Sequence, residues 1–209
     1  MTSPTRRFLI ALAGAALLGA GAAQAAPLSA ADQALVDKAT AYIQTLASAK
    51  GRFTQIDARG TVTGGDLWLQ RPGKARFAYD GPGGLLVVSN GNNVNLWDPR
   101  LKTYESYPLS RTPLALLLAR EVRLDQGVSV SAVTRRADGF SITAVDAKRQ
   151  TLGRISLDFS DAPVALTGWT VTDVKGGQTR VTLSGLTPTA GLDRKLFVLN
   201  DPRPRVGKP

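Results

Sequence analysis

Few side chains in this chain are suited to chemistry. The chain has 209 residues and contains no histidine and no cysteine. This composition excludes a Ser-His-Asp triad, a cysteine nucleophile, a disulfide framework and a zinc site of the usual ligand types. The 16 acidic residues leave a glycosidase-like pair of carboxylates formally available, but no spacing singles out one pair. The sequence therefore predicts a protein that is not an enzyme, with no catalytic residue, no metal site and no cofactor.

The first 25 residues have the pattern of a secretory signal peptide. Arg6 and Arg7 precede an apolar run at 8–18, and Ala23-Gln24-Ala25 offers a small-x-small cleavage site. A membrane-spanning anchor needs about 20 apolar residues, which this run does not reach. We expect cleavage after Ala25. The arginine pair fits both the general export route and the twin-arginine route, so the sequence leaves the route open.

The formal net charge of +10 falls to +8 when the leader and its two arginines are removed. A nucleic-acid binder would gather its charge in one patch. Here the basic pairs 135–136, 148–149 and 194–195 are scattered along the chain. No cysteine follows the leader to receive a lipid. We expect a soluble periplasmic protein that meets anionic headgroups or acidic docking surfaces and binds no nucleic acid.

The mature chain begins with a helical pattern. Ser29 and Asp32 form a capping box, and Gly51 is expected to end the helix. The apolar residues that recur at helical spacing between these ends are Leu35, Ala39, Tyr42, Ile43 and Leu46.

After Phe53 the apolar period changes to two, which is typical of strands. Tight Gly-, Pro- and Asn-rich turns separate the segments, which indicates an antiparallel β-barrel or β-sandwich in a single domain, residues 26–209. The expected strands are 52–58, 62–70, 74–80, 85–89, 94–98, 101–107, 128–136, 139–146, 153–160, 166–174, 178–185 and 194–199. A barrel of about 11 strands has room for a cavity, whereas a sandwich with a packed core would show the same pattern.

The segment 112–120 interrupts the strands with a second helical pattern. Thr112 and Pro113 suit a helix start, and the residues that follow are apolar on nearly every side. Such a helix must be covered on more than one face. It is either a plug that closes one barrel end permanently or a lid whose leucines occupy a cavity until an apolar ligand replaces them.

An ordered set of short motifs resembles the LolA family of periplasmic outer-membrane lipoprotein carriers. The set spans almost the whole mature chain. Its pieces are Phe53-Thr54-Gln55, the run Gly65 to Lys74, Phe77-Ala78-Tyr79, Leu86 to Gly91, Leu96 to Pro99, Thr112-Pro113, Phe197 and Asp201-Pro202.

This resemblance implies an incomplete antiparallel β-barrel covered by an N-terminal helix and a lid helix, with an apolar cavity inside. It places Arg71 as the residue that holds the lid shut and assigns three leucines, Leu114, Leu117 and Leu118, to the lid. The residues expected to line the lipid-binding cavity are Ile43, Leu46, Phe77 and Tyr79. Ala75 departs from the family pattern, because many members carry a bulky aromatic residue there, so docking of a transporter at that spot is not assumed.

The resemblance also implies partners. Carriers of this kind accept triacylated lipoproteins from an ATP-driven transporter in the inner membrane and deliver them to an outer-membrane receptor or to the outer membrane itself. We expect a monomer. A relative of the same fold that senses or holds lipid without handing it on is the alternative.

The last residues, 203–209, form a basic, proline-rich tail. Its prolines cannot continue a central strand. The tail is either a frayed end or a charged docking segment.

Overall fold

The computed structural model describes residues 28–112, 114–121, 128–146 and 153–203. The expected signal peptide, Pro113, the basic pair at 148–149 and the tail after Arg203 lie outside these ranges. No helix within them is both long enough and apolar enough to cross a membrane.

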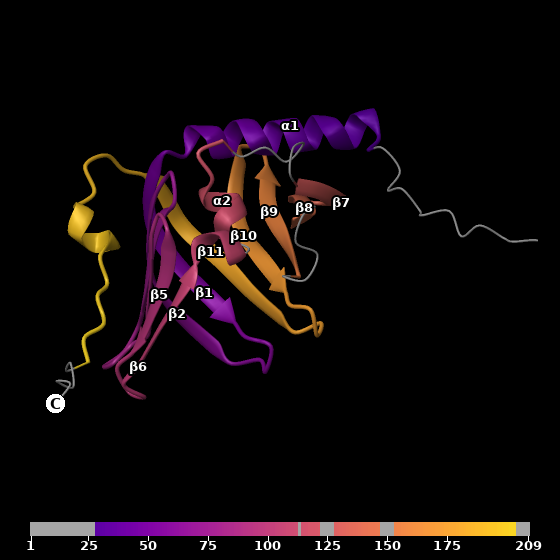
Figure 1. The fold of residues 1–209 in the computed structure, drawn as a ribbon. Coiled ribbons are helices and arrows are strands. Elements are labelled where there is room, and N and C mark those ends of the chain that lie inside the picture. Colours follow the sequence, from indigo (N-terminus) through magenta and orange to yellow (C-terminus); the bar gives the residue numbers. More distant parts are fainter. Residues whose placement is uncertain (1–27, 113, 122–127, 147–152, 204–209) are drawn as a thin grey trace, which may run out of the picture.

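One curved antiparallel sheet of eleven strands forms the body of the molecule (Figure 1). The strands are β1 (Ser48–Ile56), β2 (Val62–Gln70), β3 (Lys74–Tyr79), β4 (Leu86–Asn90), β5 (Asn93–Asp98), β6 (Thr103–Pro108), β7 (Val128–Arg136), β8 (Gly139–Asp146), β9 (Arg154–Asp161), β10 (Val164–Thr172) and β11 (Gln178–Pro188). They follow the order β6-β5-β4-β3-β2-β1-β11-β10-β9-β8-β7. Because β6 and β7 are the two edges and do not pair, the barrel is incomplete, which confirms the expected fold class.

Alternation along the strands separates an apolar inner face from a polar outer face. In β8, Phe140, Ile142 and Ala144 are at most 1% exposed, and the alternate residues are hydroxylic. In β9, Ile155 and Leu157 are buried in the same core. Since side chains of a strand point alternately to opposite faces, the inward apolar residues of neighbouring strands meet in one interior.

Helix α1 (Ala30–Thr45) covers one end of the barrel (Figure 1). Its expected cap is confirmed, because the backbone N–H of Asp32 donates to Ser29 Oγ at 3.1 Å. The expected end at Gly51 is wrong. The helix ends at Thr45 with Leu46 as its C-cap, and Gly51 lies within β1. The pairing of β1 with β2 from Ser48 onward extends the strand backward over residues that the sequence assigned to the helix.

The expected strand at 194–199 is also wrong. The Asp193 carboxylate accepts the backbone N–H of Lys195 at 2.8 Å, and Arg194–Phe197 forms a 3-10 helix instead. Phe197 is 2% exposed and its ring lies 6.0 Å below Lys74 Nζ, on the outer face of β3. The end of the described chain, residues 189–203, thus lies over the outer wall, at the left of Figure 1, and we call it the strap.

Phe159 connects α1 to the barrel. Its ring stacks on Phe140 at a centroid distance of 5.3 Å and meets the edge of Tyr42 from α1 at 6.4 Å. We expect Phe159→Ala to lower the free energy of unfolding by about 3–5 kcal/mol through the cavity that it leaves. Urea unfolding measures this loss, and Thr167→Ala, at an exposed position of β10, is the control. Equal stability of the two variants would contradict this packing role.

Candidate functional site

The segment between β6 and β7 lies on the concave side of the sheet (Figure 1). We call residues 109–112 and 114–121 the lid segment. It contains a 3-10 turn, Leu109–Arg111, and helix α2, Leu114–Leu118. The regular helix is shorter than the expected 112–120. The hydroxyl of Thr112 donates to the Leu109 carbonyl at 2.8 Å and so belongs to the preceding turn.

The apolar face of the lid segment fills the interior of the barrel. Leu117 and Leu118 are 3% and 1% exposed. The void that remains between the lid segment and the wall is about 10 Å³, close to the smallest cavity that holds one water molecule. Its lining residues are Leu67, Leu69, Ala75, Phe77, Leu114, Leu117, Leu118, Leu166, Trp169, Leu183 and Leu186. Any apolar ligand that enters this space must therefore displace the leucines.

The structure brings four of the expected site residues together at this void, namely Phe77, Leu114, Leu117 and Leu118. Ile43 and Leu46 are buried in the same core but do not line the void. Tyr79 lies farther along β3.

The environment of Tyr79 differs from that of the void. Its hydroxyl donates to Gln55 Oε1 at 2.7 Å, and its ring meets Phe53 at 4.9 Å. Burial raises the pKa of the Tyr79 hydroxyl, and the hydrogen bond with Gln55 partly opposes this rise. Tyr79 lines a separate cleft at the end of the barrel opposite α1.

Several residues that line the void are not among the expected cavity residues. Trp169 is the largest of them; its ring meets Phe77 edge-on at 6.1 Å. Leu166 lines the void from the same strand. Simple alternation would place Leu166 and Trp169 on opposite faces, but a bulge between Leu166 and Gly168 shifts the register of β10 against β9. The remaining residues were recognisable as inward strand positions, but their meeting point depends on the curvature of the sheet.

Ala75 lies on the wall directly at the void and is 1% exposed. The void has no room for a bulky aromatic side chain at this position. We expect Ala75→Phe to force the lid segment outward, with a loss of about 1–3 kcal/mol in the free energy of unfolding. Thermal unfolding and binding of a fluorescent apolar probe test this, with lower stability and more probe bound as the expected result. Wild-type values for both would contradict the filled interior.

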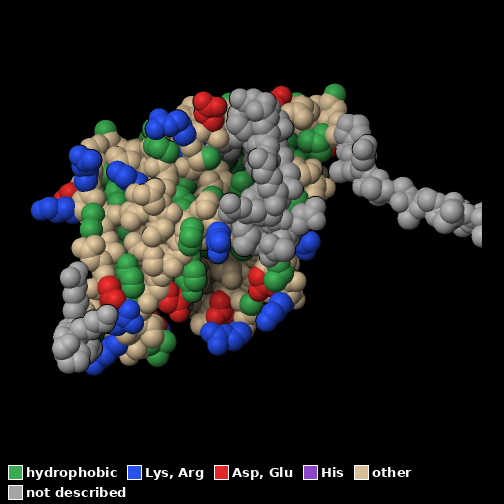
Figure 2. Space-filling view, in the orientation of Figure 1, with side chains coloured by type: hydrophobic (Ala, Val, Ile, Leu, Met, Phe, Trp, Pro, Cys, Tyr) green, Lys and Arg blue, Asp and Glu red, His purple; other side chains and the backbone are tan. Residues whose placement is uncertain are grey.

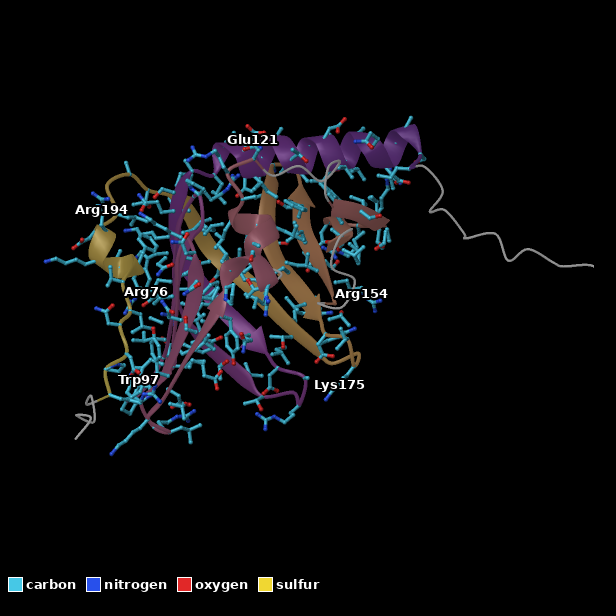
Figure 3. The ribbon with its side chains drawn as sticks, viewed as in Figure 1. Arg76, Trp97, Glu121, Arg154, Lys175 and Arg194 are labelled. Carbon is cyan, nitrogen blue, oxygen red and sulfur yellow. The ribbon has the colours of Figure 1, made fainter. Side chains whose placement is uncertain are left out.

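Arg71 joins the lid segment to α1. Its Nε and Nη2 donate to the Ala119 carbonyl at 3.0 and 2.7 Å, and Nη2 also donates to the Arg120 carbonyl at 3.1 Å. Nη1 donates to the Ile43 carbonyl near the end of α1, and Gln44 Oε1 accepts from Nη2 at 3.4 Å. Figure 3 shows Glu121, the residue after Arg120, beside α1. One guanidinium therefore satisfies carbonyls at the ends of both helices.

Backbone contacts hold the same junction. The N–H of Gly73 donates to the Leu118 carbonyl at 2.8 Å. Gly73 has a φ of 79°, and a Cβ there would approach Gly91 Cα to 2.7 Å, so the turn requires glycine. Burial lowers the pKa of the Arg71 guanidinium, which nevertheless stays charged at neutral pH.

Among the described residues, apolar side chains line the void and Arg71 supplies the hydrogen-bonded clasp beside it. Within the described residues, no group of three acidic residues lies close enough together to hold a metal ion. Figure 2 shows a hollow in the lower half of the molecule, bordered by charged side chains.

Known proteins resemble this chain along most of its length. A relative from Chromohalobacter salexigens, named outer-membrane lipoprotein carrier protein, is 27% identical over 195 residues, which cover 88% of this chain and 92% of the relative. A protein of the same name from Pseudomonas aeruginosa is 29% identical over 182 residues, covering 82% and 86%. Among solved structures, a LolA superfamily protein from Nitrosomonas europaea superposes with a TM-score of 0.48 at 11% identity over 80% of this chain and 97% of that one.

The family model described as outer membrane lipoprotein carrier protein LolA matches residues 44–200. This range runs from the end of α1 to the C-terminal strap and includes Arg71, the lid segment and every residue that lines the void. The chain therefore belongs to the LolA family of outer membrane lipoprotein carrier proteins.

Proposed function

We propose that this protein is a periplasmic carrier that binds the acyl chains of lipoproteins released from the inner membrane and delivers them to the outer membrane. The observation that supports this most is the apolar interior of the barrel, which is filled by leucines of the lid segment. The names of the relatives support the same role. Carriage needs no chemical step, which suits a chain without histidine or cysteine.

The energetic need for such a carrier follows from the ligand. An acyl chain of about 16 carbons, at about 0.8 kcal/mol per methylene, costs about 13 kcal/mol to expose to water. A lipoprotein therefore crosses the aqueous periplasm only with its acyl chains covered. The carrier must also release them, and leucines that refill the vacated space compete with the ligand and lower its net affinity.

The proposed route begins with export. The signal peptide is removed after Ala25, and the mature chain, residues 26–209, stays in the periplasm as a single domain and a monomer. An ATP-driven inner-membrane transporter supplies triacylated lipoproteins, and an outer-membrane receptor or the outer membrane itself takes them. In this cycle Arg71 holds the empty lid shut, and Leu114, Leu117 and Leu118 yield their places to the acyl chains. Phe77 lines the space that receives these chains, and Ile43, Leu46 and Tyr79, which do not border the void in this structure, join that surface when the lid opens.

Reconstitution tests the proposal. Purified mature protein is incubated with inner-membrane vesicles that contain the transporter and a labelled lipoprotein, and the complex is then added to outer membranes. We expect ATP-dependent release into a soluble one-to-one complex, followed by transfer. Saturable binding without transfer would instead favour the lipid-sensing alternative, and absence of a soluble complex would overturn both.

A further inference from the structure

Three hairpin turns lie at the end of the barrel opposite α1 (Figure 1). They connect β1 to β2, β5 to β6, and β10 to β11, as the pairs Ile56–Val62, Asp98–Thr103 and Thr172–Gln178 show. We call the residues 56–62, 98–102 and 173–177 the open-end turns. The turns reach the same end of the barrel because the strands from β11 through β1 to β6 pair antiparallel with their neighbours.

The open-end turns share one construction. In each, an aspartate carboxylate accepts two backbone N–H groups of its own turn, which tightens the turn. The bonds run from Arg59 and Thr61 to Asp57 (2.8 and 2.9 Å), from Arg100 and Leu101 to Asp98 (2.9 and 3.1 Å), and from Lys175 and Gly177 to Asp173 (2.7 and 2.9 Å).

Aliphatic side chains project from these turns into solvent. Within the described parts of the chain, six large hydrophobic side chains are exposed, and four of them belong to the open-end turns. Leu101 is 71% exposed, Val174 65%, Val62 63% and Ile56 42%. Scattered single residues need no explanation, but a concentration at one end of the molecule indicates a contact surface.

Cations flank the aliphatic residues. Arg59 is 88% exposed whereas its partner Asp57 is 26% exposed, and Arg100 is 74% exposed against 15% for Asp98. Lys102 and Lys175 are exposed as well. Figure 3 shows Lys175 at the lower end of the molecule, pointing away from it. The tips of these turns therefore present aliphatic and cationic side chains; Asp57 and Asp98 are turned back into their turns, whereas Asp173 is exposed.

We propose that the open-end turns form a docking surface for anionic phospholipid membranes. Aliphatic residues at the tips enter the boundary between headgroups and acyl chains, and the flanking lysine and arginine side chains stay at the phosphates. Shallow insertion of this kind gives reversible binding, which suits a protein that must leave the membrane again. Aliphatic and basic residues together favour a lipid surface over an acidic protein, which would need the cations alone.

Docking in this orientation would place a cleft against the bilayer. The cleft, about 550 Å³, opens between the turns at 56–62 and 98–102, and its lining includes the cations Arg59 and Arg100, the carboxylates of Asp57, Asp80 and Asp98, and the side chains of Gln55 and Tyr79. The ring of Tyr79 at its inner end contacts the buried Phe53. The lipid surface would thus face the end of the barrel that lies nearest to this aromatic pair.

Vesicle binding by the mature protein tests the surface without any lipoprotein, so its outcome is independent of the proposed carrier function. We expect flotation with vesicles of phosphatidylglycerol and phosphatidylethanolamine, weaker flotation in high salt, and little with phosphatidylcholine alone. Absence of binding to the anionic vesicles at low salt would overturn the proposal.

Substitutions separate the open-end turns from the general charge of the protein. The pair Lys102→Gln and Lys175→Gln is expected to weaken vesicle binding about 25-fold, since each lysine near an anionic surface contributes about fivefold. The matched control removes two exposed cations of the strap, Arg194→Gln and Lys195→Gln, and should change binding little. Equal losses in both pairs would show general attraction and contradict the docking surface.

The aliphatic contribution has its own pair of variants. Leu101→Ser with Val174→Ser is expected to weaken vesicle binding about tenfold. Tyr107→Ser with Val198→Ser, which are 47% and 56% exposed outside the open-end turns, is the control. Because the chain has no cysteine, a single Leu101→Cys variant can also carry a polarity-sensitive dye. A blue shift with anionic vesicles, absent in Val198→Cys, is the expected result; the same response at both positions would overturn the assignment.

Discussion

Replacing Arg71 by leucine is expected to trap acyl ligands in the protein. In the closed state the guanidinium donates to carbonyls of Ala119, Arg120 and Ile43 and to Gln44 Oε1. Opening the lid breaks the bonds to its own carbonyls, so these bonds favour the empty, closed state. Hydrogen bonds to a charged group contribute about 1.5–3 kcal/mol each, and a net loss of about 2 kcal/mol would shift the lid equilibrium about 30-fold toward opening.

The measurement is the affinity for a fluorescent triacylated lipopeptide and its rate of release to acceptor membranes. We expect tighter binding and slower release by Arg71→Leu. Arg76→Leu is the matched control, because Arg76 is also partly buried but donates to the Leu196 carbonyl on the outer wall at 3.1 Å. Figure 3 shows Arg76 on the side of the strap. Release by Arg71→Leu at the wild-type rate would contradict the clasp.

Replacing Leu117 by glutamate is expected to abolish carriage without unfolding the barrel. Leu117 is 3% exposed and faces the void in the interior. A buried, unpaired carboxylate costs several kcal/mol, so the lid segment should swing out and place the charge in water. The same charge then borders the space that acyl chains must enter. The barrel itself should persist because Phe53, Phe140 and Phe159 pack without the lid segment.

Uptake of a labelled lipoprotein from inner-membrane vesicles measures this effect, and circular dichroism checks the fold. Leu117→Met, which conserves volume and polarity, is the control and should carry lipoproteins nearly as well as wild type. A folded Leu117→Glu variant that still takes up lipoproteins would contradict the role of this segment as a lid. The permanent-plug alternative makes the opposite prediction, namely a loss of stability with no link to the ligand.

Local pattern in the sequence predicts most of the wall. Phe140, Ile142 and Ala144 alternate with hydroxylic residues in β8, and this pattern suffices to place the strand and its inner face. The predicted helix end was wrong because pairing of β1 with β2 competes with helical propensity near Leu46, and the strand pairing prevails. The predicted strand at 194–199 was wrong because Asp193 caps a short 3-10 helix that the strand pattern does not reveal.

The site was predictable in part. Leu114, Leu117 and Leu118 stand in a run too apolar for an exposed helix, and Phe77 lies in a motif of the family. Trp169 and Leu166 were not among the expected cavity residues, because the bulge in β10 changes which residues face inward. The several bonds of Arg71 to two helices cannot be read from its place beside Pro72, since they join parts of the chain up to 49 residues apart.

Photo-crosslinking from the acyl chains of a bound lipopeptide is the most direct test of the proposed carrier. A photoreactive group near the end of one acyl chain should label residues of the filled interior, above all Phe77, Trp169 and Leu117. Labelling should fall when unlabelled lipopeptide competes. Saturable labelling confined to the outer wall, such as the strap around Phe197, would contradict binding inside the barrel.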